Sequence, residues 1–145
     1  MIAVDTNIFI YALDDLELVK HERAVVFLES LGRDAKPKAL PWQVACELLA
    51  WMRRNATKST VSNEQIRADI TSVTTRFPLV YPSHRLLGIS LDLTSRHSLS
   101  HWDSLLVAAC IEAGVETLYS EDMGDGVVYD SVTVINPLKS PAATN

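Results

Sequence analysis

Several features that would mark a membrane, secreted or disulfide-stabilised protein are missing from this sequence. It holds two cysteines among 145 residues and has no CxxC pattern of the kind found in zinc or redox sites. Its longest apolar run falls far short of the roughly 20 residues that span a bilayer, and no basic segment of a signal peptide precedes its first apolar residues. We therefore expect a reduced, cytoplasmic protein in which Cys46 and Cys110 are buried free thiols, with a disulfide between them as the alternative.

Positive charge is also scarce. Lys and Arg number 13 against 18 Asp and Glu, which gives a formal net charge of −5. This balance argues against a simple basic nucleic-acid binder, whose footprint is a surplus of Lys and Arg. It does not exclude a nuclease, because a carboxylate metal site adds negative charge that a divalent cation offsets. The length and the hydrophobic content of 48% fit one globular domain, which we place at residues 1–137, with a flexible tail at 138–145.

The common phosphate, dinucleotide and nucleophile motifs are absent as well. The chain has no GxxxxGK[ST], no GxGxxG and no GxSxG. His97 and His101 have the spacing of a metal pair on a helix, but residues 98–100 between them are typical of a helix break. We interpret both histidines as surface or loop residues.

Strand-like and helix-like segments alternate along the chain. Short apolar segments predict strands at 2–4, 39–40, 79–81, 116–120 and 132–135. Helical periodicity covers 16–31, 42–55, 62–76, 83–97 and 100–113, with Gly32 and Gly114 as C-terminal caps and a polar loop at 55–60. This alternation predicts an α/β fold, a three-layer domain with a mostly parallel sheet flanked by helices.

Four acidic residues lie where such a fold collects its chemistry. Asp5 follows the first strand and Asp122 the fourth, and open parallel sheets bind their ligands just past the carboxyl ends of the strands. Asp103 begins the helix that leads into the fourth strand. Glu47 is the only acid within the apolar segment 44–52, where an unpaired carboxylate is costly and usually has a partner or a metal.

Each of these acids also has a purely structural interpretation. Asp5 suits the N-cap of the following helix, and Asp103 completes a Ser-x-x-Asp capping box with Ser100. Glu47 could occupy a narrow solvent strip or pair with an arginine. Asp122 belongs to the acidic segment 121–126, whose composition is typical of a solvated turn.

Convergent carboxylates repel one another unless a cation neutralises them. Oxygen ligands of this type suit Mg²⁺ or Mn²⁺ better than zinc. Such ions activate water and stabilise the attacking and leaving oxygens of a phosphodiester. The four acids therefore indicate hydrolytic phosphodiester cleavage, which needs no covalent enzyme intermediate.

Four segments in order resemble the PIN domain family, and within it the VapC toxins of toxin–antitoxin pairs. They are Ile2-Ala3-Val4-Asp5-Thr6-Asn7, Cys46-Glu47-Leu48, Trp102-Asp103-Ser104-Leu105-Leu106-Val107-Ala108-Ala109 and Leu118-Tyr119-Ser120-Glu121-Asp122-Met123-Gly124-Asp125-Gly126. The resemblance covers the chain to about Pro137. It implies a five-stranded parallel sheet and a Mg²⁺- or Mn²⁺-dependent endoribonuclease with RNA as substrate.

The same resemblance assigns roles to individual residues. It implies that Asp5, Glu47, Asp103 and Asp122 are the catalytic, metal-binding quartet. Thr6, Asn7 and Ser120 would be supporting polar residues, and Asp125 a further site candidate. It also implies a cognate antitoxin that inserts a segment near the site, and a homodimer.

Two rival interpretations remain open. One is a non-catalytic PIN-like module that binds RNA or a protein, and the other is a housekeeping PIN nuclease without an antitoxin. Arg53, Arg54 and Lys58 form a candidate contact patch for the RNA backbone, with a solvated helix end as the alternative.

Overall fold

The computed structural model describes residues 1–140, which form a six-stranded sheet in the order β3-β2-β1-β4-β6-β5. Five strands are parallel, in agreement with the prediction: β1 (Ile2–Val4), β2 (Lys38–Pro41), β3 (Leu79–Val80), β4 (Thr117–Tyr119) and β6 (Val132–Ile135). The sixth, β5 (Val128–Tyr129), runs antiparallel to β6 and was not predicted. Its two residues are too few to produce an alternating pattern, and it exists because the chain turns back at Asp130, which has φ 54°.

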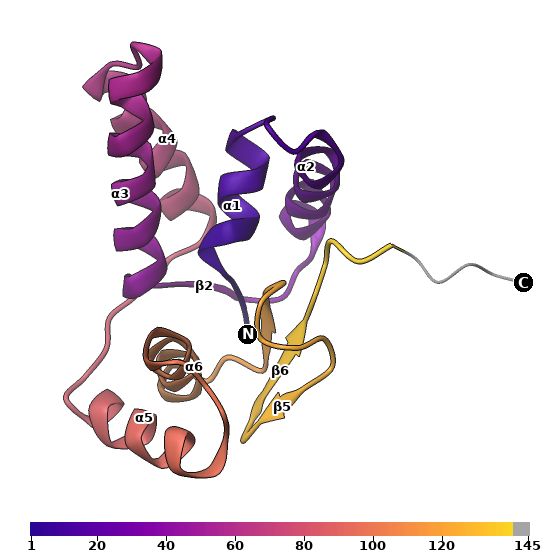
Figure 1. Ribbon diagram of the computed structural model, residues 1–145, viewed down its shortest axis with the longest axis vertical. Coiled ribbons are helices and arrows are strands. Elements are labelled where there is room, and N and C mark those ends of the chain that lie inside the picture. Colours follow the sequence, from indigo (N-terminus) through magenta and orange to yellow (C-terminus); the bar gives the residue numbers. More distant parts are fainter. Residues whose placement is uncertain (141–145) are drawn as a thin grey trace, which may run out of the picture.

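Six helices connect the strands. Their bounds are α1 (Thr6–Leu13), α2 (Leu18–Arg33), α3 (Trp42–Ser59), α4 (Asn63–Arg76), α5 (Arg85–Arg96) and α6 (His101–Ala113). In Figure 1, α1 and α2 lie on one side of the strands and α5 and α6 on the other, while α3 and α4 form a hairpin that extends from the end of β2. The three-layer α/β prediction is therefore confirmed. No helix within residues 1–140 combines the length and the apolar character needed to cross a membrane.

Local capping signals explain where α4 begins and where α6 begins and ends. The Ser62 hydroxyl accepts the Gln65 backbone N–H at 3.1 Å, and the Ser100 hydroxyl accepts that of Asp103 at 3.2 Å. Helix α6 ends at Gly114, whose φ of 74° places it in the left-handed region that glycine adopts without strain.

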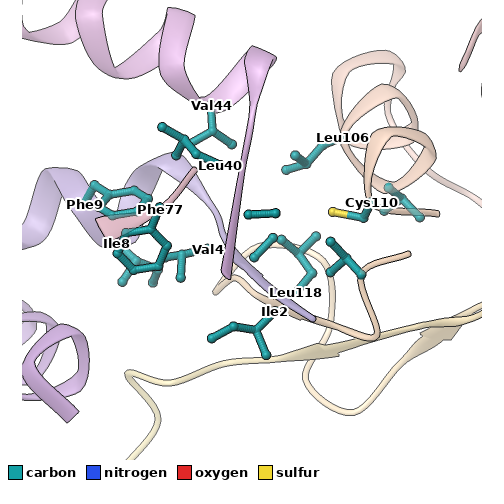
Figure 2. Close-up of a cluster of buried hydrophobic side chains, with 14 of the residues drawn as sticks. Ile2, Val4, Ile8, Phe9, Leu40, Val44, Phe77, Leu106, Cys110 and Leu118 are labelled. Atoms are coloured by element: carbon teal, nitrogen blue, oxygen red, sulfur yellow. The ribbon is translucent and has the colours of Figure 1, made fainter. Parts of the chain in front are cut away.

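The apolar core lies on both faces of the central strands. Figure 2 shows Ile8, Phe9 and Phe77 grouped on one side and Leu106 and Cys110 on the other. The rings of Phe9 and Phe77 meet edge to face, with centroids 5.2 Å apart. Strand β1 is buried along its whole length, as expected for the centre of a parallel sheet covered on both faces.

Several local predictions were wrong. Gly32 lies inside α2, and residues 55–59 continue α3, because the polar side chains there face solvent and the helix keeps its backbone bonds. Cys46 is exposed, since it lies on the outward face of α3, whereas Cys110 is buried as expected; both are free thiols.

The packed part of the chain extends past residue 137. Leu138 is buried, and its carbonyl accepts a hydrogen bond from Arg23 Nη1 at 2.8 Å. The remainder of the predicted tail, 141–145, lies outside the described residues.

Candidate functional site

Asp5 is held at the carboxyl end of the central strand β1. Its Oδ1 accepts the backbone N–H of Thr6 at 2.7 Å, so it caps α1, as one interpretation of the sequence predicted. Its Oδ2 accepts the Ser120 hydroxyl at 2.8 Å. Because β1 and β4 are parallel neighbours, with Val4 opposite Tyr119, Asp5 and Ser120 follow their strands at the same edge of the sheet. Only 8% of Asp5 is exposed, so a carboxylate is placed where solvent barely reaches it.

Glu47 approaches the same place from the second turn of α3. Its Oε2 accepts the hydroxyl of Thr6 at 2.6 Å, and its Oε1 accepts Gln43 Nε2 at 2.9 Å. Thr6 therefore links Glu47 to Asp5, since its backbone binds one acid and its side chain the other. Within residues 1–140, no Lys, Arg or His lies within ion-pair distance of Glu47, which removes the proposed pairing with an arginine.

Asp122 joins from the loop that follows β4. Its Oδ2 accepts Asn7 Nδ2 at 2.6 Å, and its backbone N–H donates to the Ser120 hydroxyl at 3.2 Å. Ser120 thus contacts both acids, as donor to Asp5 and as acceptor from Asp122. The predicted supporting residues Thr6, Asn7 and Ser120 all hydrogen-bond to predicted site acids.

The charges of these acids act on one another. The pKa of Asp5 is raised from 3.8 to about 6, chiefly by burial, and the negative charges of Asp122 and Glu47 raise it further. The hydrogen bonds from Ser120 and Thr6 oppose this shift. We call Asp5, Glu47 and Asp122 the acid cluster, because the negative charges of the other two act on Asp5 at the end of β1 and β4.

Asp103 is placed differently. It lies half-buried in the first turn of α6, and its backbone is capped by Ser100. Gln43 Nε2 bonds both Glu47 and the carbonyl of Trp102 (3.2 Å), so the start of α6 is tied to α3 beside Glu47. Among the described residues, the Asp103 carboxylate has no hydrogen-bond or ion-pair partner, so its membership of the cluster stays a prediction.

Asp125 has a partner elsewhere. Its Oδ1 accepts the Asn136 backbone N–H at 2.9 Å, and its Oδ2 lies 2.9 Å from Lys139 Nζ. These contacts hold its pKa below the usual value. Through these two contacts Asp125 stabilises the segment that follows β6.

The donor set fits a divalent cation in its chemistry. Asp5, Glu47, Asp103 and Asp122 offer only oxygen ligands, and no described cationic side chain pairs with any of them. Within residues 1–140, however, no three Asp, Glu, His or Cys side chains are gathered closely enough to hold an ion together. Glu47 and Asp122 would bind a cation there through water, or directly after losing their hydrogen bonds to Thr6 and Asn7.

Several residues at this edge were not singled out from the sequence. Gln43 lies four positions before Glu47, a spacing that brings side chains together on a helix. Tyr11, four positions after Asn7, donates its hydroxyl to Glu121 at 2.5 Å. Lys20 Nζ lies 3.2 Å from the other Glu121 oxygen. Helical spacing from the predicted site residues could have identified Gln43 and Tyr11, but nothing local connects Lys20 to Glu121.

Comparisons with known proteins give one family and several solved structures. A family model described as the PIN domain matches residues 2–124. No curated protein matches the chain significantly. The fold is similar to VapBC2 from Rickettsia felis bound to a promoter DNA fragment, with a TM-score of 0.65 and 18% identity over 92% of this chain and 97% of that one.

Two further structures share the fold. A toxin–antitoxin complex from Klebsiella pneumoniae has a TM-score of 0.64 and 20% identity, covering 94% of this chain and 98% of that one. VapC20 from Mycobacterium tuberculosis, described as a sarcin–ricin loop cleaving toxin, has a TM-score of 0.61 and 17% identity, covering 85% and 91%.

Proposed function

The chain belongs to the PIN domain family, and from this membership we propose that it is a metal-dependent endoribonuclease acting as the toxin of a toxin–antitoxin pair. The observation that carries the proposal is the buried Asp5, on which the negative charges of Asp122 and Glu47 act and which has no protein counter-ion among the described residues. Such an arrangement costs stability unless a cation neutralises it, so we infer that the site exists for binding one.

Asp5 and Asp103 would hold the cation mainly, with Glu47 and Asp122 completing its surroundings directly or through water. A divalent cation supplies Lewis acidity, which activates water for attack on phosphorus and offsets charge on the phosphate oxygens. The hydrolysis would leave a 5′-phosphate and a 3′-hydroxyl.

The chain's own residues orient these acids. Ser120 fixes the Asp5 carboxylate by donating to Oδ2, and Thr6 fixes Glu47. Asn7 holds Asp122 toward α1. Burial of Asp5 favours its neutral form, so at pH below about 6 it would carry a proton and bind a cation weakly.

An antitoxin partner is supported by the similar structures, which are described as VapBC and toxin–antitoxin proteins. We propose the same for this chain, together with a homodimer and a location in the cytoplasm. Co-expression with the product of a neighbouring gene, followed by affinity purification of the tagged chain, tests the pairing. A nuclease that purifies alone would be a housekeeping enzyme.

The deciding experiment is a cleavage assay on single-stranded and structured RNA with Mg²⁺ or Mn²⁺, with EDTA and Asp5→Asn as controls. We expect cation-dependent cuts that expose 5′-phosphates and disappear in both controls. RNA binding without cleavage in either metal would instead identify a non-catalytic PIN module.

A further inference from the structure

A cleft of about 540 Å³ opens beside the acid cluster, between α3, α5 and α6. Most of its lining is apolar, and Glu47 forms part of it. The cleft is therefore continuous with the acid cluster, because this carboxylate accepts Thr6 at the end of β1. Its volume lies within the range of roughly 300–1,000 Å³ that is usual for ligand sites.

Two tryptophans line this cleft from opposite helices. Trp42 begins α3, five residues before Glu47, and Trp102 precedes Asp103 in α6. Both are exposed, Trp42 to 45% and Trp102 to 63%. Neighbouring rings support them: Tyr81 lies 5.4 Å from Trp42, and His101 lies 4.8 Å from Trp102, centroid to centroid. An exposed indole thus lies near the start of each of the two helices that carry Glu47 and Asp103.

The lining suits the base of a nucleotide better than its phosphate. The described residues around the cleft include no Lys or Arg, and Glu47 would repel an anion. A base is flat and uncharged, and it stacks on aromatic side chains whatever its identity. Bases in a duplex are already stacked, so only an unpaired base could enter.

We propose that this cleft receives an unpaired nucleobase adjacent to the scissile phosphate, stacked on Trp102 and Trp42. The proposal rests on the proposed function and adds to it a base-binding subsite beside the acids. Trp42 and Trp102 then bind the base, while the acids perform the chemistry.

Cys46 offers a probe that needs no change in the cleft. It is exposed and lines the cleft, whereas Cys110, the other cysteine, is fully buried. The alkylation rate of the native wild-type protein therefore measures the accessibility of Cys46, and Cys46→Ser is the negative control. In EDTA, we expect short single-stranded RNA to slow alkylation, and the same strand annealed to its complement, or made abasic, to have little effect.

Matched variants separate stacking from simple apolar contact. Trp102→Phe keeps an aromatic face, while Trp102→Leu keeps apolar bulk without one. By fluorescence anisotropy in EDTA, we expect Trp102→Leu to bind single-stranded RNA roughly tenfold more weakly than wild type. Trp102→Phe should stay within a few-fold of wild type. Leu16→Ala, at an exposed site in another part of the molecule, serves as the control.

Three results would overturn the proposal. One is equal protection of Cys46 by normal and abasic RNA, or none by either. Another is equal RNA binding by the Phe and Leu variants. The third is protection without RNA that grows with protein concentration, which would show that a second copy of the chain covers the cleft. Since binding is measured without metal, a failure of cleavage is seen separately and concerns the proposed function alone.

Discussion

The start of α1 and the start of α6 look alike in sequence and differ in the structure. Asp5 and Asp103 both lie at a helix N-terminus with a capping pattern, and in both regions the capping contact forms. Yet Asp5 is buried between a backbone N–H and the Ser120 hydroxyl, while the Asp103 carboxylate is half-buried with no partner among the described residues. A capping pattern therefore neither excludes nor establishes a functional role.

The cause of the difference is the neighbouring strand. Asp5 leaves a strand whose parallel neighbour β4 ends at the same level, so Ser120 and Asp122 lie beside it. Asp103 lies in the first turn of α6, which follows a loop, and the start of this helix is tied to α3 by the bond from Gln43 to the carbonyl of Trp102.

The largest effect is expected for Asp5→Asn. We expect it to lower RNA cleavage by roughly two orders of magnitude or more, the scale of losing a preorganised electrostatic group. The measurement is the initial cleavage rate with Mn²⁺ at equal protein concentration. Wild-type activity in this variant would remove Asp5 from the site.

Glu47→Gln should lose activity but keep its stability. Gln retains an oxygen for the bond from Gln43 and the helix propensity of Glu, while the cation loses a charged ligand, so we expect a roughly ten- to hundredfold loss. Thermal melting in EDTA and the cleavage rate are compared with Glu22→Gln, an exposed acid on α2. A large fall in melting temperature without loss of rate would make Glu47 structural.

The raised pKa of Asp5 predicts a pH dependence of stability in EDTA. Because its folded pKa of about 6 exceeds the unfolded value of 3.8, the folded state binds more protons between these values. Stability should therefore fall as pH rises from about 4 to about 6, by up to about 3 kcal/mol from this group. Urea denaturation of wild type and Asp5→Asn measures it, and the variant should lack this component. Identical pH profiles would contradict the raised pKa of Asp5 in the folded protein.

Ser120→Ala tests how the residue that follows the neighbouring strand β4 affects Asp5. Its hydroxyl lowers the pKa of Asp5, so removing it should raise that pKa and move the acid limb of the pH–rate profile upward. Loss of one such bond, about 1 kcal/mol, should reduce the rate severalfold near pH 6 and less at higher pH. Ser90→Ala, another buried serine, is the control. If the acid limb of the pH–rate profile stays at the wild-type pH, the protonation of Asp5 does not determine that limb.

The smallest effect concerns the metal-free stability of Asp103→Asn. As a first-turn acid it should contribute about 0.3–1 kcal/mol to its helix, so the variant should melt slightly lower in EDTA, like Glu64→Gln in α4. Asp5→Asn should instead melt higher at neutral pH. If Asp103→Asn also melts higher in EDTA, Asp103 already shares the repulsion of the cluster without a cation, and the contrast between the two acids in the metal-free protein fails.

Much of the fold was predictable because its signals are local. Helix α6 has an apolar periodicity, a serine cap and a terminal glycine, and all three survive in the structure. Strand β5 and the last turn of α3 were missed, because two-residue pairing and a polar helix end leave no periodic signal. The exposure of Cys46 depends on which face of α3 is covered, which composition does not reveal.

The sequence alone determined the order of strands and helices and the acids that follow them, since periodicity and parallel topology place Asp5 and Asp122 at one edge. Only the tertiary structure decided which of these acids lie close together. Thr6 meets Glu47 across 41 residues and Asn7 meets Asp122 across 115, contacts set by helix packing and strand pairing. Burial and charge repulsion, which raise the pKa of Asp5, arise only when those distant segments exclude water from the same place.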